Sequence, residues 1–335
     1  MYQQGSTQSY EAHLSILCCP SCQSSLKAQG DNLSCENRDC GKTFPIIQGR
    51  PVLISEEGSL SSIDDFMHLP PAALATPQHP LWSKAEAFYR KFKSLSSVNL
   101  SAEKSFETFA ELVMQSSSAP RVLVVGVGTQ GKGMHKITSH DSIQLINTDI
   151  SPSRNALLFS DGHDLPFKEG TIDGVIIQAV LEHVLDPLQC VREIHRVLKK
   201  TGIVYSEIPF MQQGHSGRHD FTRFTHLGHR RLFRHFEEVD SGVVAGPGTS
   251  MAWALEYFVA SFAPSRKMMK VASFITRTTG FWLKYFDYLF SNSPAAIDGA
   301  SCIYFLGRKS DQVLTDKELI SQYRGTQDSC YTPSR

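Results

Sequence analysis

Five of the eight cysteines in this 335-residue chain lie between Cys18 and Cys40. Four of them form two short pairs, Cys19-Pro-Ser-Cys22 and Cys35-Glu-Asn-Arg-Asp-Cys40, with twelve residues between the pairs. Two such pairs on tight turns can place four thiolates at the corners of a tetrahedron, which is the geometry of closed structural Zn²⁺ sites. A segment of about forty residues has too little core to fold alone, so metal ligation would supply folding energy. The spacing predicts a structural zinc site at Cys19, Cys22, Cys35 and Cys40, with Cys18 left over.

The cysteine segment also resembles a known family. Leu17-Cys-Cys-Pro-Ser-Cys22, the second cysteine pair and Phe44-Pro-Ile-Ile-Gln-Gly-Arg-Pro-Val-Leu-Ile54 are similar to the small zinc-ribbon domain that activates methyltransferases as a separate subunit. The resemblance implies a structural role, or a docking surface for a protein partner. Four cysteines leave no open position for water, so we expect no chemistry at the zinc.

A glycine-rich turn follows a buried strand in Val122-Leu-Val-Val-Gly126-Val-Gly128-Thr-Gln-Gly131. Glycines let the backbone adopt positive φ and approach a ligand closely. Leu145-Ile-Asn-Thr-Asp149 ends a second strand about twenty residues further on, where a carboxylate can accept both hydroxyls of a ribose. These features fit a dinucleotide and S-adenosylmethionine (SAM) alike, and the turn alone is also compatible with a plain tight turn.

Further motifs follow in order. They are Asp161-Gly-His-Asp-Leu-Pro-Phe167, then Asp173 with the segment Leu181-Glu-His-Val184, and Glu193-Ile-His-Arg-Val-Leu-Lys199. With the glycine turn, they make residues 120–245 and a last strand at 301–307 resemble a class I SAM-dependent methyltransferase of the type 11 group, which includes ubiquinone-type enzymes. The resemblance implies an α/β fold with a Rossmann-like doubly wound sheet, and it is uninformative about the acceptor.

The resemblance also implies cofactor contacts. Those implied residues are Gly126, Gly128 and Gly131 beside the methionine part of SAM, Asp149 with its neighbour Ile150 at the ribose, Asp161 at the adenine amino group and Gln178 beside the sulfonium. One position departs from the family pattern, because Val124 stands where an acid often orients the methionine amino group. Both nucleoside-reading acids remain, so we expect an active enzyme. A non-enzymatic interaction protein with a degenerate SAM pocket is an alternative.

The loop after the strand at 202–208 is predicted to face the acceptor, because ligands lie outside the carboxyl ends of the strands in this architecture. It contains His215, His219 and Asp220 within a few residues of one another. A histidine can act as general base toward an acceptor hydroxyl at neutral pH, with Asp220 orienting it. An equally weighted alternative is that these residues only form hydrogen bonds within the loop, with Asp220 paired with Arg223. His183 is expected to pack near the SAM pocket in a structural role.

An aromatic insertion at 248–292 lies between the last two predicted strands. It contains eleven of the thirty-three aromatic residues and five Lys or Arg against two acids. Met251 to Ala263 and Phe281 to Phe290 are predicted as short amphipathic helices. Such a segment can form a lid over the acceptor pocket, or lie in a membrane interface, and the second role would fit a lipid-linked acceptor.

The remaining pattern predicts the domain organisation. Strands are expected at 121–125, 144–149, 172–177, 202–208, 236–244 and 301–307, alternating with helices as in a parallel sheet. A helix is predicted within 81–114, and another after Asp186, with Pro187 at its first position and Leu188, Val191, Ile194 and Leu198 as its buried stripe. The predicted units are a zinc ribbon at 14–54, a linker at 55–80, the methyltransferase domain at 81–310 and a flexible tail at 311–335.

Composition limits the function classes. Lys plus Arg and Asp plus Glu both number 33, and a zero net charge argues against an RNA methyltransferase that grips RNA through its ribbon. Arg230, Arg231 and Arg234 make only a small basic patch, interpreted as a solvated helix face. The sequence has no long apolar run and no signal-like N-terminus. We therefore expect a cytoplasmic protein, with peripheral membrane contact through 248–292 as an alternative. The sequence favours SAM-dependent O-methylation of a small-molecule, saccharide or glycolipid acceptor, with structural Zn²⁺; a C-methyl acceptor is also compatible.

Overall fold

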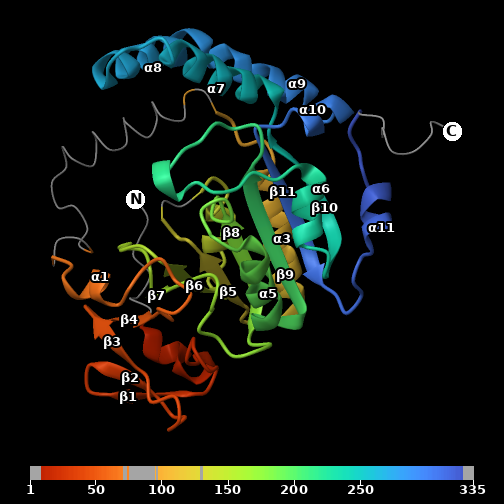
Figure 1. Cartoon of the computed structure of the whole chain (residues 1–335). Coiled ribbons are helices and arrows are strands. Elements are labelled where there is room, and N and C mark those ends of the chain that lie inside the picture. The colour runs from red at the N-terminus through yellow and green to blue at the C-terminus, as the bar shows by residue number, and fades with distance from the viewer. Residues whose placement is uncertain (1–8, 71–73, 75–94, 96, 129–130, 327–335) are drawn as a thin grey trace.

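The computed structural model describes residues 9–70, 74, 95, 97–128 and 131–326. Its strands form a single eleven-stranded sheet with the order β1-β2-β3-β4-β7-β6-β5-β8-β9-β11-β10 (Figure 1). The strand bounds are β1 Leu26–Gln29, β2 Asn32–Cys35, β3 Thr43–Ile47, β4 Arg50–Leu53, β5 Arg121–Val125, β6 Gln144–Asp149, β7 Leu158–Ser160, β8 Ile172–Gln178, β9 Leu198–Pro209, β10 Phe236–Ala245 and β11 Cys302–Lys309. The strands from β4 through β7, β6, β5 and β8 to β9 run parallel, whereas both outer parts of the sheet are antiparallel.

Helices cover both faces of the parallel core. Alternate residues of β5 divide between two apolar clusters: Val122 and Val124 pack with Phe106 and Phe109 of α3 (Ala102–Ser116), while Leu123 and Val125 belong to the cluster that contains α5 (Pro187–Val197). This period-two alternation is what a strand buried on both faces requires. The Rossmann-like α/β fold predicted from the sequence is confirmed.

The predicted strands match the structure closely, with β9 beginning earlier and the short β7 not predicted. The helix α5 begins as predicted, because the Asp186 side chain accepts a hydrogen bond from the Gln189 backbone N–H and Pro187 occupies the first turn. Its predicted buried stripe is wrong at Leu188, which is 44% exposed; Cys190 and Val197 are buried instead. In the predicted helix at 81–114, α3 begins only at Ala102, and residues 81–94 and 96 lie outside the described residues.

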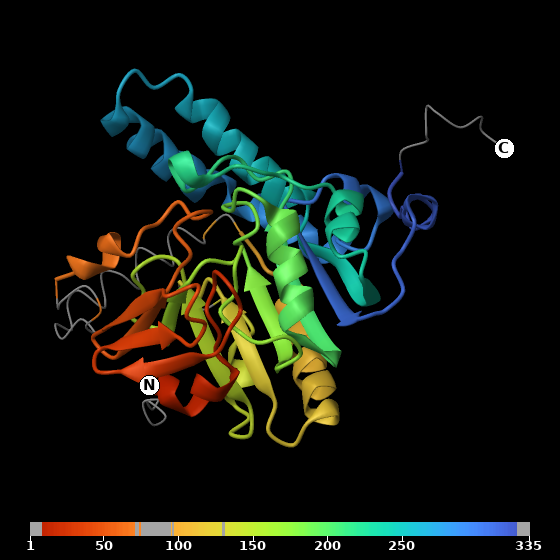
Figure 2. The ribbon, with the colours of Figure 1, turned by 60° about the horizontal axis from the view of Figure 1, so that its bottom comes forward.

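The cysteine module is joined to the main sheet by backbone pairing. After the 3₁₀ helix η1 (Tyr10–Ile16), strands β1 to β4 form an antiparallel meander whose last strand lies parallel to β7, with Val52 opposite Phe159. The Arg50 side chain donates hydrogen bonds to the carbonyl oxygens of Ala156 and Arg154, at 2.8 and 3.0 Å. The module therefore extends the sheet at its β7 edge, as Figure 2 shows.

The segment predicted as a linker contains packed structure. The helix α1 (Asp64–Met67) buries Phe66, whose ring centroid lies 4.8 Å from that of Phe159. This contact reinforces the junction between the module and β7. Residues 71–73 and 75–80 of the same segment lie outside the described residues.

The aromatic insertion forms a helical layer above the carboxyl ends of the strands (Figure 1). The layer consists of α7 (Pro247–Ala260), α8 (Arg266–Gly280), η5 (Phe281–Phe286) and α9 (Asp287–Phe290), and α10 (Pro294–Asp298) follows the insertion. The buried Asp287 carboxylate accepts hydrogen bonds from the backbone N–H groups of Gly246, Gly248 and Thr249, so it caps the start of α7. A buried pair between Glu256 and Arg277 joins α7 to α8 at 2.8 Å. The sequence did not predict α8, whose apolar residues are mostly exposed.

The chain after β11 differs from the predicted flexible tail. Residues 311–326 include α11 (Asp316–Ser321), which begins at a capping box formed by Thr315 and Glu318 and buries Leu319. Arg324 donates hydrogen bonds to Ser241 on β10. Among the described residues, no helix is long and apolar enough to cross a membrane.

Candidate functional site

The four predicted zinc ligands converge in the module. The Cys19 and Cys40 sulfurs lie 3.8 Å apart, the Cys22 and Cys35 sulfurs lie 3.4 Å apart, and all four lie within 4.8 Å of one another. Sulfurs bound to Zn²⁺ at about 2.3 Å in a tetrahedron are about 3.8 Å apart, so the donor set fits the ion. Cys18 is buried and takes no part, as predicted: its backbone N–H bonds to the Pro166 carbonyl oxygen, and burial raises the pKa of its thiol to about 11.

The glycine turn follows β5 with little room for side chains. Gly126 has a φ of +73°, and a Cβ there would lie 2.4 Å from a methyl carbon of Val180. A Cβ at Gly131 would lie 2.7 Å from the Gln178 side-chain oxygen, whereas one at Gly128 meets nothing within 4 Å. The turn is therefore tightly packed at both ends and open at Gly128, which is the shape of a backbone cradle for a ligand.

Asp149 holds this cradle at the end of β6. Its carboxylate accepts hydrogen bonds from the Gly128 backbone N–H at 2.9 Å and from the Ser151 N–H and hydroxyl at 2.9 and 2.7 Å. Ile150, half-buried, packs against the cluster that contains α3. The acid predicted to read the ribose thus lies beside the glycine turn, and it also fixes the backbone there.

Asp161 is engaged by two neighbours. His163 donates from its backbone N–H and places its ring nitrogen 2.6 Å from Oδ1, and the Ser59 hydroxyl donates to Oδ2 at 2.6 Å. Burial acts to raise the pKa of Asp161, but these hydrogen bonds outweigh it and lower the pKa below its ordinary value. The acid predicted to read adenine is therefore ionised and tied to the segment that follows the cysteine module.

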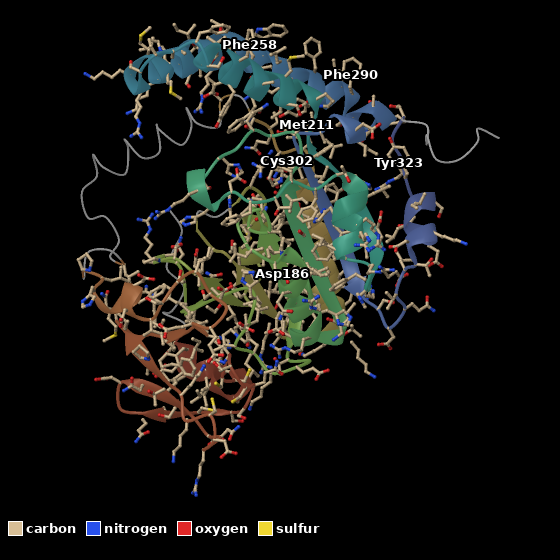
Figure 3. The ribbon with its side chains drawn as sticks, viewed as in Figure 1. Asp186, Met211, Phe258, Phe290, Cys302 and Tyr323 are labelled. Carbon is tan, nitrogen blue, oxygen red and sulfur yellow. The ribbon has the colours of Figure 1, made fainter. Side chains whose placement is uncertain are left out.

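A pocket of about 240 Å³ opens at the carboxyl ends of β8 and β9, roofed by the start of α7. Its lining includes the polar side chains of Asn99, Glu182, Glu207, Gln212, His215 and Cys302. Figure 3 shows Cys302 beneath the helical layer that carries Phe258 and Phe290. Burial raises the pKa of the Cys302 thiol to about 12, so it stays protonated and donates to Gln212 Oε1 at 3.1 Å.

Glu207 is the carboxylate at the end of β9, directly beside Gln178 in the β8–β9 pairing. Its oxygens accept hydrogen bonds from the Tyr205 hydroxyl and from Asn99 Nδ2. Burial raises the pKa of Glu207, and these hydrogen bonds only partly oppose the effect. A carboxylate more basic than usual therefore faces the pocket.

The predicted catalytic loop is braced internally. Asp220 pairs with Arg223 and accepts a hydrogen bond from the His215 backbone N–H at 2.6 Å; the Arg223 hydrogen bond lowers the pKa of Asp220 to about 2. The His219 side chain is exposed and absent from the pocket lining, and only its carbonyl oxygen contacts the site, through His183 Nδ1 at 2.7 Å. Of the three predicted residues, His215 alone faces the pocket.

Residues 123–206 match the family model described as a methyltransferase domain. The chain carries a class I methyltransferase domain. It is a SAM-dependent methyltransferase, with a four-cysteine cluster at its N-terminal end.

Comparison with solved structures finds similar chains at low identity and low TM-score. One is the complex between the Haloferax volcanii Trm112 methyltransferase activator and a methyltransferase, with 18% identity, a TM-score of 0.38, and coverage of 68% of this chain and 96% of that one. Another is geranyl diphosphate C-methyltransferase from Streptomyces coelicolor A3(2), with 13% identity, a TM-score of 0.40, and coverage of 72% and 84%. Likenesses at this level carry no argument about the acceptor. Comparison with curated proteins gave no match.

Sequence reasoning missed two acids that line the pocket, Glu182 and Glu207. Glu207 ends a buried strand at the edge predicted to face the acceptor, so its position was a usable signal. Glu182 stands in the Leu181-Glu-His-Val184 segment, where only His183 was considered. Neither acid belongs to a spacing pattern that indicates a role without the structure.

Proposed function

We propose that this methyltransferase transfers a methyl group from SAM to a hydroxyl of a saccharide or glycolipid acceptor. The observation that carries the proposal is the pocket beside Gln178, whose walls present amide, imidazole and carboxylate groups to a ligand of about one sugar ring. Such groups bind hydroxyls in fixed orientations, which is how a specific site selects a polyol.

The cradle residues fit SAM, which supplies an electrophilic methyl group when bound. The Gly126 turn and the Asp149 carboxylate would hold its methionine and ribose parts, and Asp161 its adenine. Glu207 is the base that we assign to the acceptor hydroxyl, because it lines the pocket next to Gln178 and carries a raised pKa. Asn99 and Gln212 orient the acceptor, and the roof formed by α7 excludes water. Positioning of this kind can supply about 7 to 11 kcal/mol of the barrier reduction in a reaction between two bound groups.

The cysteine module is proposed to bind structural zinc and to act as an activator-like ribbon within the same chain. Its support is the pairing of β4 with β7 and the contact between Ser59 and Asp161, which connect the module to the cofactor side of the sheet. The zinc itself contacts no acceptor in this proposal.

The outer face of the helical layer supports an acceptor at a membrane surface. Its exposed apolar side chains include Phe258 (63%), Phe262 (72%) and Leu289 (74%), and basic residues follow at Arg266, Lys267 and Lys270. The inner side of the same layer reaches the acceptor loop, because the Tyr257 hydroxyl donates to the Gly214 carbonyl oxygen at 2.6 Å. An interfacial helix pair over the pocket would place a lipid-linked saccharide at its mouth.

RNA is a weaker acceptor candidate on this structure. Arg230 is buried and pairs with Glu238 at 3.1 Å, which corrects its interpretation as part of a solvated face. Arg231 and Arg234 both pair with Asp316. The charge of the small basic patch is therefore partly offset by Glu238 and Asp316.

Vesicle co-sedimentation tests the membrane part of the proposal. The full chain should sediment with vesicles that contain anionic phospholipid more than with purely zwitterionic ones, and Phe258→Ser with Leu289→Ser should weaken the effect. Ile320→Ser, at an exposed apolar residue of α11, is the matched control and should bind like the parent. Equal sedimentation of all samples, or none, would contradict membrane contact.

An acceptor assay tests the reaction itself. Zinc-replete protein is incubated with methyl-labelled SAM and either glycolipids in vesicles or free saccharides, and the product is analysed by mass spectrometry. An O-methylated sugar supports the proposal. Label found only on carbon or nitrogen of other acceptors, or in RNA, would contradict it.

A further inference from the structure

We propose that Glu182, His183 and His215 form a second metal site that holds a divalent transition-metal ion beside the acceptor pocket. The site is separate from the four cysteines and uses a different donor set. Its role in catalysis rests on the proposed O-methylation, whereas its ability to bind an ion does not.

The first argument is the condition of Glu182. Its side chain is 1% exposed, and neither carboxylate oxygen has a hydrogen-bond partner among the described residues. The nearest ring nitrogens, Nε2 of His183 and Nε2 of His215, lie 3.7 and 3.6 Å from Oε1, beyond hydrogen-bond length. A buried carboxylate left in this state costs several kcal/mol, and a bound cation removes that cost.

The second argument is the arrangement of the three donors. One carboxylate oxygen and one nitrogen from each imidazole lie within 4.8 Å of one another. Ligands held at about 2.1 Å from an ion are separated by about 3.0 Å in octahedral and about 3.4 Å in tetrahedral coordination. The distances of 3.6 and 3.7 Å between Glu182 Oε1 and the two imidazole nitrogens therefore need to shorten only slightly, and the two imidazole nitrogens, which lie within 4.8 Å of each other, must also approach. Two histidines and one carboxylate leave further positions open to a ligand from the pocket.

The third argument is that the surroundings hold the donors in place. His183 Nδ1 lies 2.7 Å from the His219 carbonyl oxygen, so Nδ1 must carry the proton and Nε2 keeps its lone pair for a metal. The backbone N–H groups of Phe221 and Thr222 donate to the Glu182 carbonyl oxygen at 2.8 and 3.2 Å. These bonds bring the loop that carries His215 onto Glu182.

Two other neighbours are compatible with an ion. The Ser216 hydroxyl lies 3.4 Å from His183 Nε2 and can turn away or approach an ion as a further oxygen donor. Arg223 Nη2 lies 3.4 Å from His215 Nδ1, but the Arg223 charge is paired with the Asp220 carboxylate. Oδ2 of Asp220 lies 3.7 Å from His215 Nδ1. The net charge facing the donors is therefore not positive.

The position indicates what the ion does. Glu182 and His215 line the pocket that also contains Glu207, so an acceptor hydroxyl can coordinate the ion there. Coordination makes the hydroxyl more acidic, and its proton passes to the Glu207 carboxylate. The oxygen then forms its bond to the methyl carbon while the carbon–sulfur bond breaks and sulfur keeps the electron pair. His215 acts in this scheme as a ligand.

Cobalt binding tests the site without using activity. Full-length protein loaded with one equivalent of Zn²⁺, which the four thiolates take first, is titrated with Co²⁺ and followed by calorimetry and absorption. Cobalt on nitrogen and oxygen donors gives ligand-field bands without the thiolate-to-cobalt charge-transfer absorption that cysteines produce. Glu182→Gln and His215→Asn remove donors, and His219→Asn is the matched control in the same loop.

The parent should bind one Co²⁺ without thiolate charge transfer. Its affinity should fall about tenfold or more in Glu182→Gln and His215→Asn and stay unchanged in His219→Asn. No uptake by the parent, uptake into the cysteines only, or equal affinity in all variants would overturn the site. Circular dichroism checks folding, and the loop variant His215→Asn keeps the test decisive if Glu182→Gln does not fold. Cobalt binding in a protein that methylates no hydroxyl would support the site and contradict the O-methylation.

Discussion

The Ser59 hydroxyl donates a 2.6 Å hydrogen bond to Asp161, so the segment that leaves the cysteine module contacts the acid assigned to the adenine of SAM. The same segment buries Phe66 against Phe159 on β7, the strand beside β4. The module, its junction and the cofactor side of the sheet therefore form one packed unit. A change in the module should alter SAM binding at the cradle.

Ser59→Ala should weaken SAM binding without unfolding the chain. The variant removes one hydrogen bond to an ionised carboxylate, which is worth about 1.5 to 3 kcal/mol, and we expect part of this loss to appear as an affinity about fivefold lower. Calorimetry measures it, with Ser62→Ala as the control, since the hydrogen bonds of Ser62 within the described part of the chain are to Asp65. Equal SAM affinity in both variants would show that the contact does not influence the cradle.

Zinc removal should destabilise the whole chain. Ligation provides folding free energy for a module whose Leu17, Leu33 and Phe44 belong to the same apolar cluster as the central strands. Cys35→Ser, or chelation of the parent, should lower the thermal midpoint of the main transition, and Cys18→Ser should do so far less. A separate early transition with the main one unchanged would contradict this coupling.

Glu207→Gln should remove turnover and keep SAM binding. Loss of a general base lowers kcat by about 10² to 10⁴. Since the base must be ionised and burial raises its pKa, the parent should lose activity as pH falls through a value above the ordinary 4.5 of glutamate. Cys302→Ser, which keeps the hydrogen bond to Gln212, is the control in the pocket wall. A Glu207→Gln variant with parental kcat would remove Glu207 from the chemistry.

Two buried histidines should make stability depend on pH. Burial lowers the pKa of His226 to about 4 and that of His229 to about 3, from an ordinary 6.5. The unfolded chain takes up protons below pH 6.5 while the folded chain does not, so this stability is complete above 6.5 and is lost as pH falls. The loss is about 2 kcal/mol for each histidine between pH 8 and pH 5. Denaturant unfolding measures it, and His229→Gln should flatten the slope whereas the exposed His140→Asn should not.

Much of the fold was predictable because the signals are local. The strand runs at 121–125 and 144–149, the cap at Asp186 and the paired cysteines each follow from short-range sequence patterns. The pairing of β4 with β7 was not predictable, because it depends on backbone partners more than one hundred residues apart. The position of Glu207 at a strand end was a local signal, but its contact with Asn99 and that of Glu182 with the loop at His215 arise only in the folded chain.

Calorimetry of SAM binding to zinc-replete protein tests the central claim most directly. The account predicts one SAM site in the parent. Asp149→Asn loses the charge that faces the Gly128 backbone and is assigned to the ribose, so its affinity should be reduced about tenfold or more. The exposed control Asp141→Asn should keep the parental affinity. No binding in the parent, or equal binding in the parent and Asp149→Asn, would contradict the assignment of the cradle to SAM.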